Sequence, residues 1–332
     1  MKTNNKTVLL KNIPLGLPRL RDFEFKSGII PTVAEGEILL KSKYISVDPY
    51  LRGKMAGTHG AAFEPGKPLS SKVIAEVVES KNSRFQKGDY VSNYLEWKEY
   101  QLSDGGGLVK LDADEVPLSA YLGVLGITGL SAYFALLEIA HPKNGETLVV
   151  SGAAGAVGTI VGQIGKIMGC RVIGVAGSDE KVALLKTKFG FDEAINYKTT
   201  TDLKAAIAAA CPNGVDIYFD NVGGKVSEAV LPNMNAYGRI PVCGAISNYN
   251  DTEIPMSPSV FPLVVIKFLT IKGFLIADHA PRFAEGLAQL SQWLKEGKIT
   301  YSETVLKGFD KLPEAFLGIF EGKNEGKMIV EI

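Results

Sequence analysis

The pattern of apolar and polar residues along the chain changes between residues 120 and 145. In the first third, short apolar runs such as 37–40, 73–78 and 90–92 are separated by glycine, proline and asparagine. This rhythm is typical of a small β-barrel or β-sandwich. From about Gly145 onward, apolar strand, glycine turn and amphipathic helix alternate. This second pattern predicts a parallel sheet that is covered by helices on both faces.

The second region contains six apolar runs that predict the strands of a doubly wound sheet. These runs cover residues 147–151, 171–176, 194–196, 215–219, 238–243 and 271–276. Residues 159–169 carry apolar side chains at helical spacing between the first two runs, which predicts a βαβ unit. After about residue 300 the pattern becomes mixed again, and we expect a short helix and a final strand over 328–332. We therefore predict an α/β protein with a β-rich domain over 1–123 and 300–332 and a Rossmann domain over 124–299.

Length and composition agree with two domains, and the net charge excludes some classes of binding partner. The chain has 332 residues, of which 46% are hydrophobic, and this is enough to fill two cores. Lys and Arg together number 36, as do Asp and Glu, so the formal net charge is zero. A neutral chain has no field that attracts nucleic acid or anionic lipid. We expect no nucleic-acid partner and no membrane partner.

One uncharged stretch, residues 118–137, has the length of a membrane span. Gly123, Gly126 and Gly129 recur within it at three-residue spacing among hydroxyl-bearing side chains. That spacing favours a buried helix that packs closely against a sheet. The interpretation as a membrane span is therefore set aside.

Cysteines and histidines argue against export and against a metal site. The three cysteines are Cys170, Cys211 and Cys243. They are few and odd in number, which suits a reducing cytoplasm better than a disulfide framework. There is no Cys-x-x-Cys cluster, and the three histidines, His59, His141 and His279, have no ligand spacing and are expected at the surface. We predict no metal, and the lack of a Gly-x-Ser-x-Gly segment argues against a hydrolase.

The strongest chemical signal is the run 149–158, VVSGAAGAVG. A predicted strand runs directly into a glycine turn and then into a helix. Gly155 lets the backbone approach a pyrophosphate, Gly158 lets helix and strand pack closely, and Ala153 stands where the first glycine is usual. The N–H groups at the helix start bind phosphate oxygens. Glycine turns also occur for structural reasons, but the following helix and second strand favour dinucleotide binding.

The end of the second predicted strand distinguishes NAD from NADP. An acidic side chain there grips the ribose diol of NAD, whereas a cation accepts the 2′-phosphate of NADP. This strand ends in Gly177 and Ser178, Lys181 follows on the first helical turn, and Tyr197 comes after the third strand. Asp179 and its neighbour Glu180 are expected at a helix N-terminus, where the dipole favours them. The pattern favours NADP.

Eight segments together resemble the zinc-independent medium-chain dehydrogenase/reductases, in the branch of prostaglandin reductases and alkenal or curcumin double-bond reductases. The segments are Val47–Arg52, Gly123–Tyr133, Ser151–Gly158, Gly177–Lys181, Asn196–Tyr197, Asp220–Gly224, Cys243–Ser247 and Gly322–Lys327. The resemblance covers essentially the whole chain. It implies a GroES-like substrate domain built from both chain ends around a Rossmann domain. It also implies NADPH as hydride donor, a small enone or alkenal substrate and a homodimer.

The resemblance also implies a set of cofactor-binding residues. The pyrophosphate turn comprises Gly152, Ala153, Ala154, Gly155, Ala156, Val157 and Gly158. The 2′-phosphate pocket comprises Ser178, Lys181 and Tyr197. Strand-end and closing residues are Asn221, Cys243, Gly244, Ala245, Ile246, Ser247, Phe274, Leu275, Ile276 and Asn324.

The expected chemistry asks for a hydrogen-bond donor to the substrate carbonyl, since charge develops on that oxygen when hydride reaches the β-carbon. Tyr50 is the first candidate for this donor and Tyr249 the second, while Arg52 is expected to contact the cofactor or to have a structural role. Mammalian-type prostaglandin reductases carry a tyrosine in the segment that matches 264–268, where this chain has Ile266. A broad alkenal or enone reductase is therefore expected. The alternatives are an NADPH:quinone oxidoreductase, a non-catalytic NADPH-binding protein and a zinc alcohol dehydrogenase.

Overall fold

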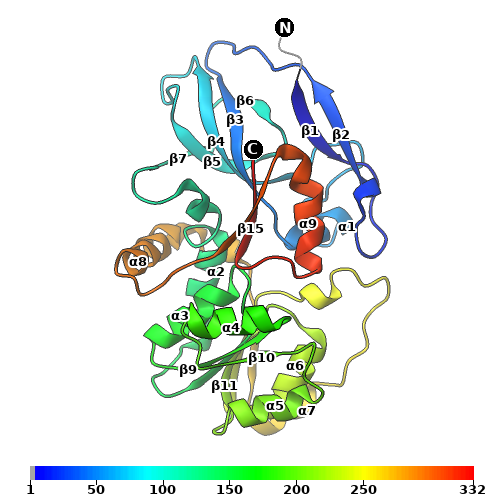
Figure 1. Ribbon diagram of the computed structural model, residues 1–332, viewed down its shortest axis with the longest axis vertical. Helices are drawn as coiled ribbons and strands as arrows, with labels where there is room; N and C mark the ends of the chain where they lie inside the picture. Colours follow the sequence, from blue (N-terminus) through cyan, green and yellow to red (C-terminus); the bar gives the residue numbers. More distant parts are fainter. Residues whose placement is uncertain (1–3) are drawn as a thin grey trace. The chain divides into compact units, whose positions relative to one another are not determined.

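The computed structural model describes residues 4–332, which fall into two units (Figure 1). Unit 1 contains the residues up to Leu122 together with Thr304–Asn324 and Met328–Ile332. Unit 2 contains Gly123–Glu303 and Glu325–Lys327. Unit 1 is rich in antiparallel strands and unit 2 is built around a parallel sheet. The predicted fold class is therefore confirmed.

Unit 1 carries, within the described residues, a seven-stranded sheet and a separate two-stranded hairpin. The large sheet has the order β14-β15-β3-β4-β5-β7, with β6 paired to β3. Its strands are β3 Ile38–Ser46, β4 Ser70–Ser80, β5 Tyr90–Glu96, β6 Tyr100–Ser103, β7 Val109–Leu111, β14 Glu303–Lys307 and β15 Lys327–Glu331. The hairpin is β1 Asn5–Leu10 with β2 Phe23–Gly28, and the helices are α1 Tyr50–Ala56 and α9 Leu312–Phe320.

The core of this sheet follows the period of two expected for strands. Ile38 and Leu40 on β3 pack with Ala75 and Val77 on β4 and with Val91 on β5. Alternate side chains of a strand point to the same face, so these residues bury one face of the sheet. The predicted runs 73–78 and 90–92 are segments of β4 and β5, and the run 37–40 starts one residue before β3. The predicted closing strand corresponds to β15, whereas β14 was not predicted.

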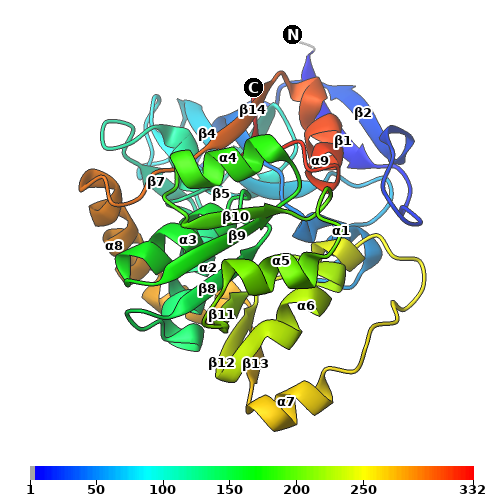
Figure 2. The same ribbon diagram turned by 60° about the horizontal axis from the view of Figure 1, so that its bottom comes forward.

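Unit 2 contains a parallel sheet of the order β10-β9-β8-β11-β12-β13. Its strands are β8 Thr147–Ser151, β9 Arg171–Ala176, β10 Glu193–Asn196, β11 Val215–Phe219, β12 Met234–Val242 and β13 Thr270–Gly273. The helices are α2 Ile127–Ala135, α3 Gly158–Ile167, α4 Asp179–Thr187, α5 Leu203–Ala210, α6 Gly224–Val230, α7 Phe261–Lys267 and α8 Phe283–Lys295. Figure 2 shows α4 on one side of β9 and β10, with α5 and α6 on the other side. The strand order reverses between β8 and β11, and such a switch point is where doubly wound sheets bind ligands.

The sixth predicted strand was too long. The expected strand over 271–276 ends at Gly273 in the structure, and Ile276 begins a 3-10 helix that runs to Arg282. The register explains the difference, because Gly273 pairs with Val242, the last residue of β12. Beyond that point the neighbouring strand offers no further ladder partner, so residues 274–276 leave the sheet.

The uncharged stretch near residues 118–137 is broken into three short pieces. A 3-10 helix spans Leu118–Leu122, α2 follows, and a π-helical turn covers Leu136–Ala140. Gly129 is required because a Cβ there would lie 1.9 Å from the carbonyl oxygen of Val124. Helix α2 packs chiefly against α3 and α8 rather than directly on the sheet. Among residues 4–332, no helix is long and apolar enough to cross a membrane.

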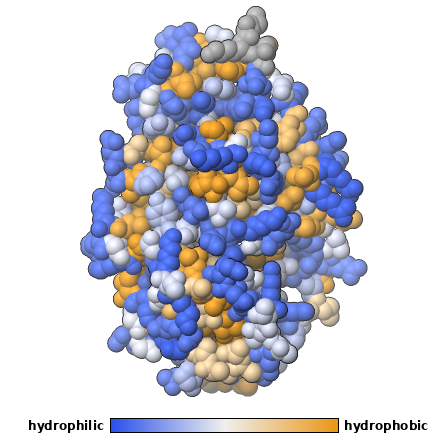
Figure 3. Space-filling view, viewed as in Figure 1, coloured by the Kyte–Doolittle hydropathy of each residue, from blue (hydrophilic) through white to orange (hydrophobic). Residues whose placement is uncertain are grey.

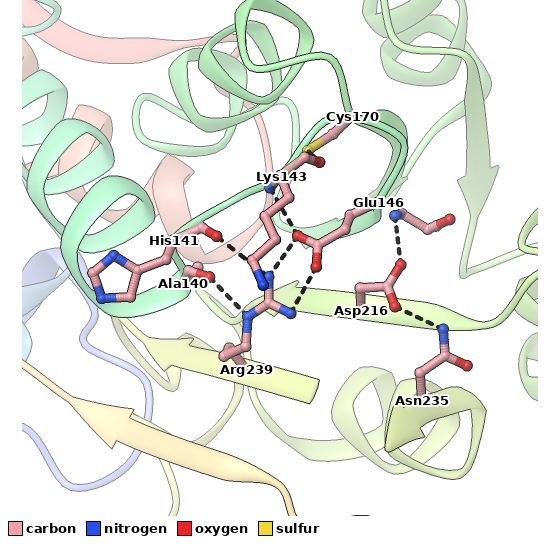
Figure 4. Close-up of polar contacts among 9 residues, drawn as sticks. Ala140, His141, Lys143, Glu146, Cys170, Asp216, Asn235 and Arg239 are labelled. Atoms are coloured by element: carbon pink, nitrogen blue, oxygen red, sulfur yellow. Dashed lines mark hydrogen bonds and ion pairs between the residues drawn. The ribbon is translucent and has the colours of Figure 1, made fainter. Parts of the chain in front are cut away.

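A polar network fixes the amino-terminal edge of the parallel sheet (Figure 4). Arg239 on β12 forms an ion pair with Glu146, which precedes β8, at 2.5 Å between Nη2 and Oε2. Asp216 on β11 accepts hydrogen bonds from Thr147 N–H and from the side-chain amide of Asn235, both at 2.8 Å. These bonds hold together the starts of β8, β11 and β12. The carboxyl ends lie at the opposite edge, which carries the candidate site.

Candidate dinucleotide-binding site

The turn between β8 and α3 is shaped by two glycines for different reasons. Gly152 has φ +57°, in the left-handed region that favours glycine. At Gly158, a Cβ would lie 2.5 Å from the carbonyl oxygen of Gly152 and 2.7 Å from Cα of Ala153. Only a residue without Cβ lets α3 start so close to the turn. The first-turn N–H groups of α3 therefore begin next to the end of β8, in the arrangement that binds phosphate.

The alanine that replaces the usual first glycine faces the protein interior. Ala153 is fully buried, and its Cβ lies 3.0 Å from the position that a Cβ on Gly174 would take. Its N–H donates to the carbonyl of Val175 at 3.1 Å, which ties the turn to β9. A methyl group is therefore accommodated here, and the turn keeps its shape without the first glycine.

A segment near the chain end also touches this turn and was missed by sequence reasoning. Gly326 donates its N–H to the carbonyl of Ala154 at 2.8 Å and forms an isolated parallel bridge with Gly155. Gly326 has φ +63°, and a Cβ there would lie 1.9 Å from the carbonyl oxygen of Ser302. The available signal was the glycine within the motif Gly322–Lys327, whose partner the sequence does not reveal.

The predicted 2′-phosphate residues meet at the carboxyl ends of β9 and β10. Gly177 follows β9, and a Cβ on it would lie 3.2 Å from the hydroxyl of Tyr197 and 3.3 Å from Cε of Lys198. Ser178 caps α4, and its hydroxyl accepts the N–H of Lys181 at 3.3 Å. The structure thus brings the Tyr197 phenol and the Lys198 side chain against one bare glycine, next to Ser178.

Two cations define the electrostatics of this pocket. Burial lowers the pKa of Lys181, nearby Glu325 raises that pKa, and the like charge of Lys198 lowers it. Lys198 was missed in the sequence analysis, although it directly follows Tyr197. Lysines together with hydroxyl donors are suited to a dianionic phosphate.

The acidic residues beside this pocket occupy the first turn of α4, as expected. Asp179 accepts a hydrogen bond from the side-chain amide of Asn196, at 2.7 Å between Oδ1 and Nδ2. Backbone and Ser178 hydrogen bonds lower the pKa of the exposed Glu180. The helix start therefore favours the charged form of Glu180.

At the switch point, Asn221 links two strands. Its side-chain amide donates to the carbonyl of Ser151 at 2.8 Å, and its N–H donates to the Ser151 hydroxyl at 2.9 Å. The preceding Asp220 is buried and accepts hydrogen bonds from the hydroxyls of Ser151 and Tyr218, each at 2.9 Å, and of Ser227 at 2.6 Å. Asp220 was not predicted, because its partners come from three elements.

A pocket of about 490 Å³ opens at the carboxyl ends of β12 and β13. It is lined by Val242, Cys243, Gly244, Ala245, Gly273, Phe274, Leu275 and Asp278. Burial raises the pKa of Cys243 to about 12, with Asp220 adding to the effect, so this thiol stays neutral. Among the predicted neighbours, Ser247 instead donates its hydroxyl to the carbonyl of Val222 at 2.6 Å, and Ile276 begins the following 3-10 helix.

The two candidate tyrosines lie in different units. In unit 2, the hydroxyl of Tyr249 accepts the N–H of Ala245 at 3.3 Å, which leaves its own hydrogen to donate. In unit 1, Tyr50 is the first residue of α1 and its hydroxyl hydrogen-bonds to Tyr94. Burial raises the pKa of Tyr50 well above its usual value, and the charge of Asp48 raises it further. Tyr94 was missed, since it lies on β5, far away in sequence.

Two other predicted residues belong to unit 1. Arg52 is buried, and its Nη2 donates to the carbonyls of Pro14 at 3.2 Å and Gly16 at 3.0 Å. These bonds hold the loop after β1, so Arg52 has a structural role. Asn324 lies half-buried between α9 and β15.

No group of three or more His, Cys, Asp or Glu side chains gathers as a metal site in residues 4–332. His59 packs against Tyr50, with ring centroids 5.6 Å apart. His279 was expected at the surface but is half-buried. It lies in the 3-10 helix after β13, stacks on Phe134 at 4.8 Å and pairs with Glu138 at 3.3 Å, because α2 and its π-helical extension pack beside it.

Comparisons with known proteins place this site in a family. Residues 6–111 match a family described as the N-terminal domain of oxidoreductase, and residues 156–293 match one described as zinc-binding dehydrogenase. The NADP⁺-dependent 2-alkenal reductase of Nicotiana tabacum is 44% identical, over 100% of this chain and 98% of that protein. Prostaglandin reductase 1 of Mus musculus is 46% identical, over 98% of each chain.

A solved structure agrees over the same length. CurA from Vibrio vulnificus in complex with NADPH superimposes with a TM-score of 0.93 at 42% identity, over 98% of each chain. The chain belongs to the medium-chain dehydrogenase/reductases. Within that family it belongs to the zinc-independent branch of alkenal, prostaglandin and curcumin reductases. The predicted family is thereby confirmed.

Proposed function

We propose that this chain reduces the carbon–carbon double bond of α,β-unsaturated aldehydes and ketones, with NADPH as the hydride donor. The observation that carries the proposal is the tight glycine turn between β8 and α3 together with Lys181 and Lys198 close to each other after the ends of β9 and β10. Two relatives support the substrate class, one named an NADP⁺-dependent 2-alkenal reductase and the other prostaglandin reductase 1, each above 40% identity over nearly its whole length.

The residues present fit an NADP-type dinucleotide. Gly158 lets the start of α3 lie against the backbone of Gly152 and Ala153, a close approach that a Cβ at 158 would prevent. The turn from Gly152 to Gly158 would hold the pyrophosphate, and Ser178, Lys181, Tyr197 and the added Lys198 would hold the 2′-phosphate. Bound NADPH supplies the hydride. Asn221, Cys243–Ser247, Phe274–Ile276 and Asn324 are proposed for the nicotinamide side.

Tyr50 is proposed as the donor to the substrate carbonyl. Because burial and Asp48 raise its pKa, the phenol keeps its proton at all physiological pH values and serves as a hydrogen-bond donor rather than as a base. Such a donor stabilises negative charge that develops on the oxygen. Tyr249 is the second candidate for this role. We accordingly propose residues 1–123 and 300–332 as the substrate domain and 124–299 as the cofactor domain.

The function is tested by following NADPH absorbance with a 2-alkenal, a long-chain enone and a quinone, and by identifying the product. The proposal expects NADPH consumption with the first two and a saturated carbonyl product. Consumption with the quinone alone would support an NADPH:quinone oxidoreductase. Tight NADPH binding without turnover of any of the three would support a non-catalytic NADPH-binding protein.

A homodimer is proposed through the edge strand β13. All four of its residues are exposed, and it pairs on one side only, with β12. The neighbouring α7 exposes Phe261, Val265 and Ile266, and Figure 3 shows apolar side chains at the lower end of the view, where Figure 1 draws α5 and α7. Two copies of such an edge can pair about a two-fold axis and cover each other. Light scattering after size exclusion is expected to give the dimer mass, and Ile271→Lys the monomer mass.

A cytoplasmic location is also proposed. The three cysteines are all unpaired with one another in the described structure. Free thiols are typical of a reducing compartment. Fractionation of cells that express the tagged chain tests this location.

A further inference from the structure

Asp179 poses a problem for a pocket that is to receive a phosphate. It stands in the first turn of α4, directly after the end of β9. In dinucleotide-binding sheets, a carboxylate near this place grips the ribose diol of NAD and repels the 2′-phosphate of NADP. Two residues further along the helix, Lys181 carries the opposite charge. The orientation of the Asp179 carboxylate therefore decides which dinucleotide the pocket favours.

The structure ties this carboxylate to the end of the neighbouring strand. Asn196, the last residue of β10, donates from Nδ2 to Oδ1 of Asp179 at 2.7 Å. The same side chain accepts the N–H of Lys198 on Oδ1 at 3.0 Å. A carboxylate only accepts and a backbone N–H only donates, so the two partners fix the orientation of the amide. Aspartate at position 196 would have no hydrogen to donate to Asp179 at neutral pH.

One amide thus holds both the acidic residue and the turn that carries the cationic residues. The backbone of Asn196 adds to this, because its carbonyl accepts the N–H of Thr200 at 3.1 Å and the Thr200 hydroxyl at 2.7 Å. Tyr197 N–H binds the carbonyl of Ala176, at the end of β9, at 3.0 Å. The turn 196–200 is therefore well fixed by backbone bonds, and the side-chain amide is left to restrain Asp179.

We propose that Asn196 is a positioning residue that sets the preference for NADPH over NADH by restraining the carboxylate of Asp179. The inference rests on the proposed use of NADPH and deepens it. A carboxylate released from Asn196 is free to turn toward the ribose or to pair with a nearby ammonium group. Either change weakens binding of a 2′-phosphate, by added repulsion or by loss of a cation.

The test measures binding alone, without substrate or turnover. Dissociation constants for adenosine 2′,5′-bisphosphate and for adenosine 5′-monophosphate are determined by isothermal titration calorimetry on the full chain. Asn196→Ala is expected to weaken binding of the bisphosphate about tenfold, equivalent to about 1.4 kcal/mol, and to change binding of the monophosphate less than about twofold. Adding Asp179→Asn to Asn196→Ala is expected to restore most of the lost affinity, since the released side chain is then neutral.

A matched control exists at the opposite edge of the same sheet. Asn235 donates from Nδ2 to Oδ1 of Asp216 at 2.8 Å, which is a bond of the same kind and only 0.1 Å longer than the 2.7 Å bond of Asn196 (Figure 4). Asn235→Ala is expected to leave the ratio of the two dissociation constants unchanged, even if it lowers the melting temperature. This control separates a general loss of stability from a change in the pocket.

The outcomes separate this inference from the proposed cofactor. If the unaltered chain binds both nucleotides equally, the proposed use of NADPH fails. If the unaltered chain discriminates and Asn196→Ala still does so to the same degree, only the role of Asn196 fails. Equal weakness of the single and the double variant would also overturn it, because the amide would then act on the turn and not through Asp179.

Discussion

Replacing Gly158 with alanine adds one methyl group where α3 approaches the backbone of the proposed phosphate-binding turn. The new Cβ would lie 2.5 Å from the carbonyl oxygen of Gly152 and 2.7 and 2.8 Å from Cα and the carbonyl oxygen of Ala153. All three contacts are with backbone, so no side chain can rotate away. The start of α3 must move, and overpacking of this kind costs about 1–3 kcal/mol of folding free energy.

The same movement displaces the N–H groups at the start of α3 from the phosphate. We expect the dissociation constant for NADPH to rise about tenfold or more, because each factor of ten corresponds to only about 1.4 kcal/mol. Urea unfolding gives the change in stability, and quenching of intrinsic fluorescence by NADPH gives the dissociation constant. The reasoning would be refuted if Gly158→Ala matched the unaltered chain in both measurements.

A helical glycine without such a contact provides the control. At Gly318 in α9, the nearest atoms to a Cβ are side-chain atoms of Lys323 and Met328 at 3.6 Å, which is ordinary van der Waals distance. Gly318→Ala is expected to stabilise the protein by about 0.5–1 kcal/mol through helix propensity, with NADPH binding unchanged. A destabilised Gly318 variant would show that glycine replacement in helices is costly here for another reason.

Three further predictions follow from the site and its supports. Lys198→Ala is expected to weaken NADPH binding about tenfold and to leave NADH binding unchanged, which titrations of the two dinucleotides at one salt concentration would show. An equal loss of affinity for NADPH and NADH would contradict a contact between Lys198 and the 2′-phosphate. Tyr50→Phe is expected to lower kcat/KM for a 2-alkenal about a hundredfold. Burial and the charge of Asp48 raise the pKa of Tyr50 above 10.0, so its phenol stays protonated up to that pH. Ionisation of Tyr50 should therefore cause no loss of kcat/KM up to pH 10. A fall in kcat/KM with a midpoint below pH 10 that disappears in Tyr50→Phe would contradict this. Arg239→Met leaves the half-buried Glu146 without its ion-pair partner and is expected to lower the free energy of unfolding in urea by about 2–4 kcal/mol. NADPH binding to the folded protein should stay unchanged, because the ion pair lies at the other edge of the sheet.

Local patterns in the sequence were sufficient to place most of the parallel sheet. The strands 147–151, 171–176 and 215–219 have the predicted bounds, because buried apolar runs between glycine turns leave few alternatives. The last strand was placed wrongly at residues 274–276, where its end depends on the length of its neighbour β12 and not on its own side chains. The strand over 303–307 has no fully buried residue and was not predicted.

The residues of the candidate site likewise fall into those that the sequence predicted and those that only the structure revealed. The sequence by itself determined the glycine turn and the positions of Ser178, Lys181 and Tyr197 after the ends of their strands, since spacing relative to a strand end is a local property; their role in a 2′-phosphate pocket stays a prediction. Only the tertiary structure decided that Lys198 adds a second cation, that Asn196 holds Asp179, and that the phenol of Tyr94 meets that of Tyr50. Each of these features brings together residues from different elements. The distance between two such residues is set by the packing of the whole unit, and no local run of residues determines it.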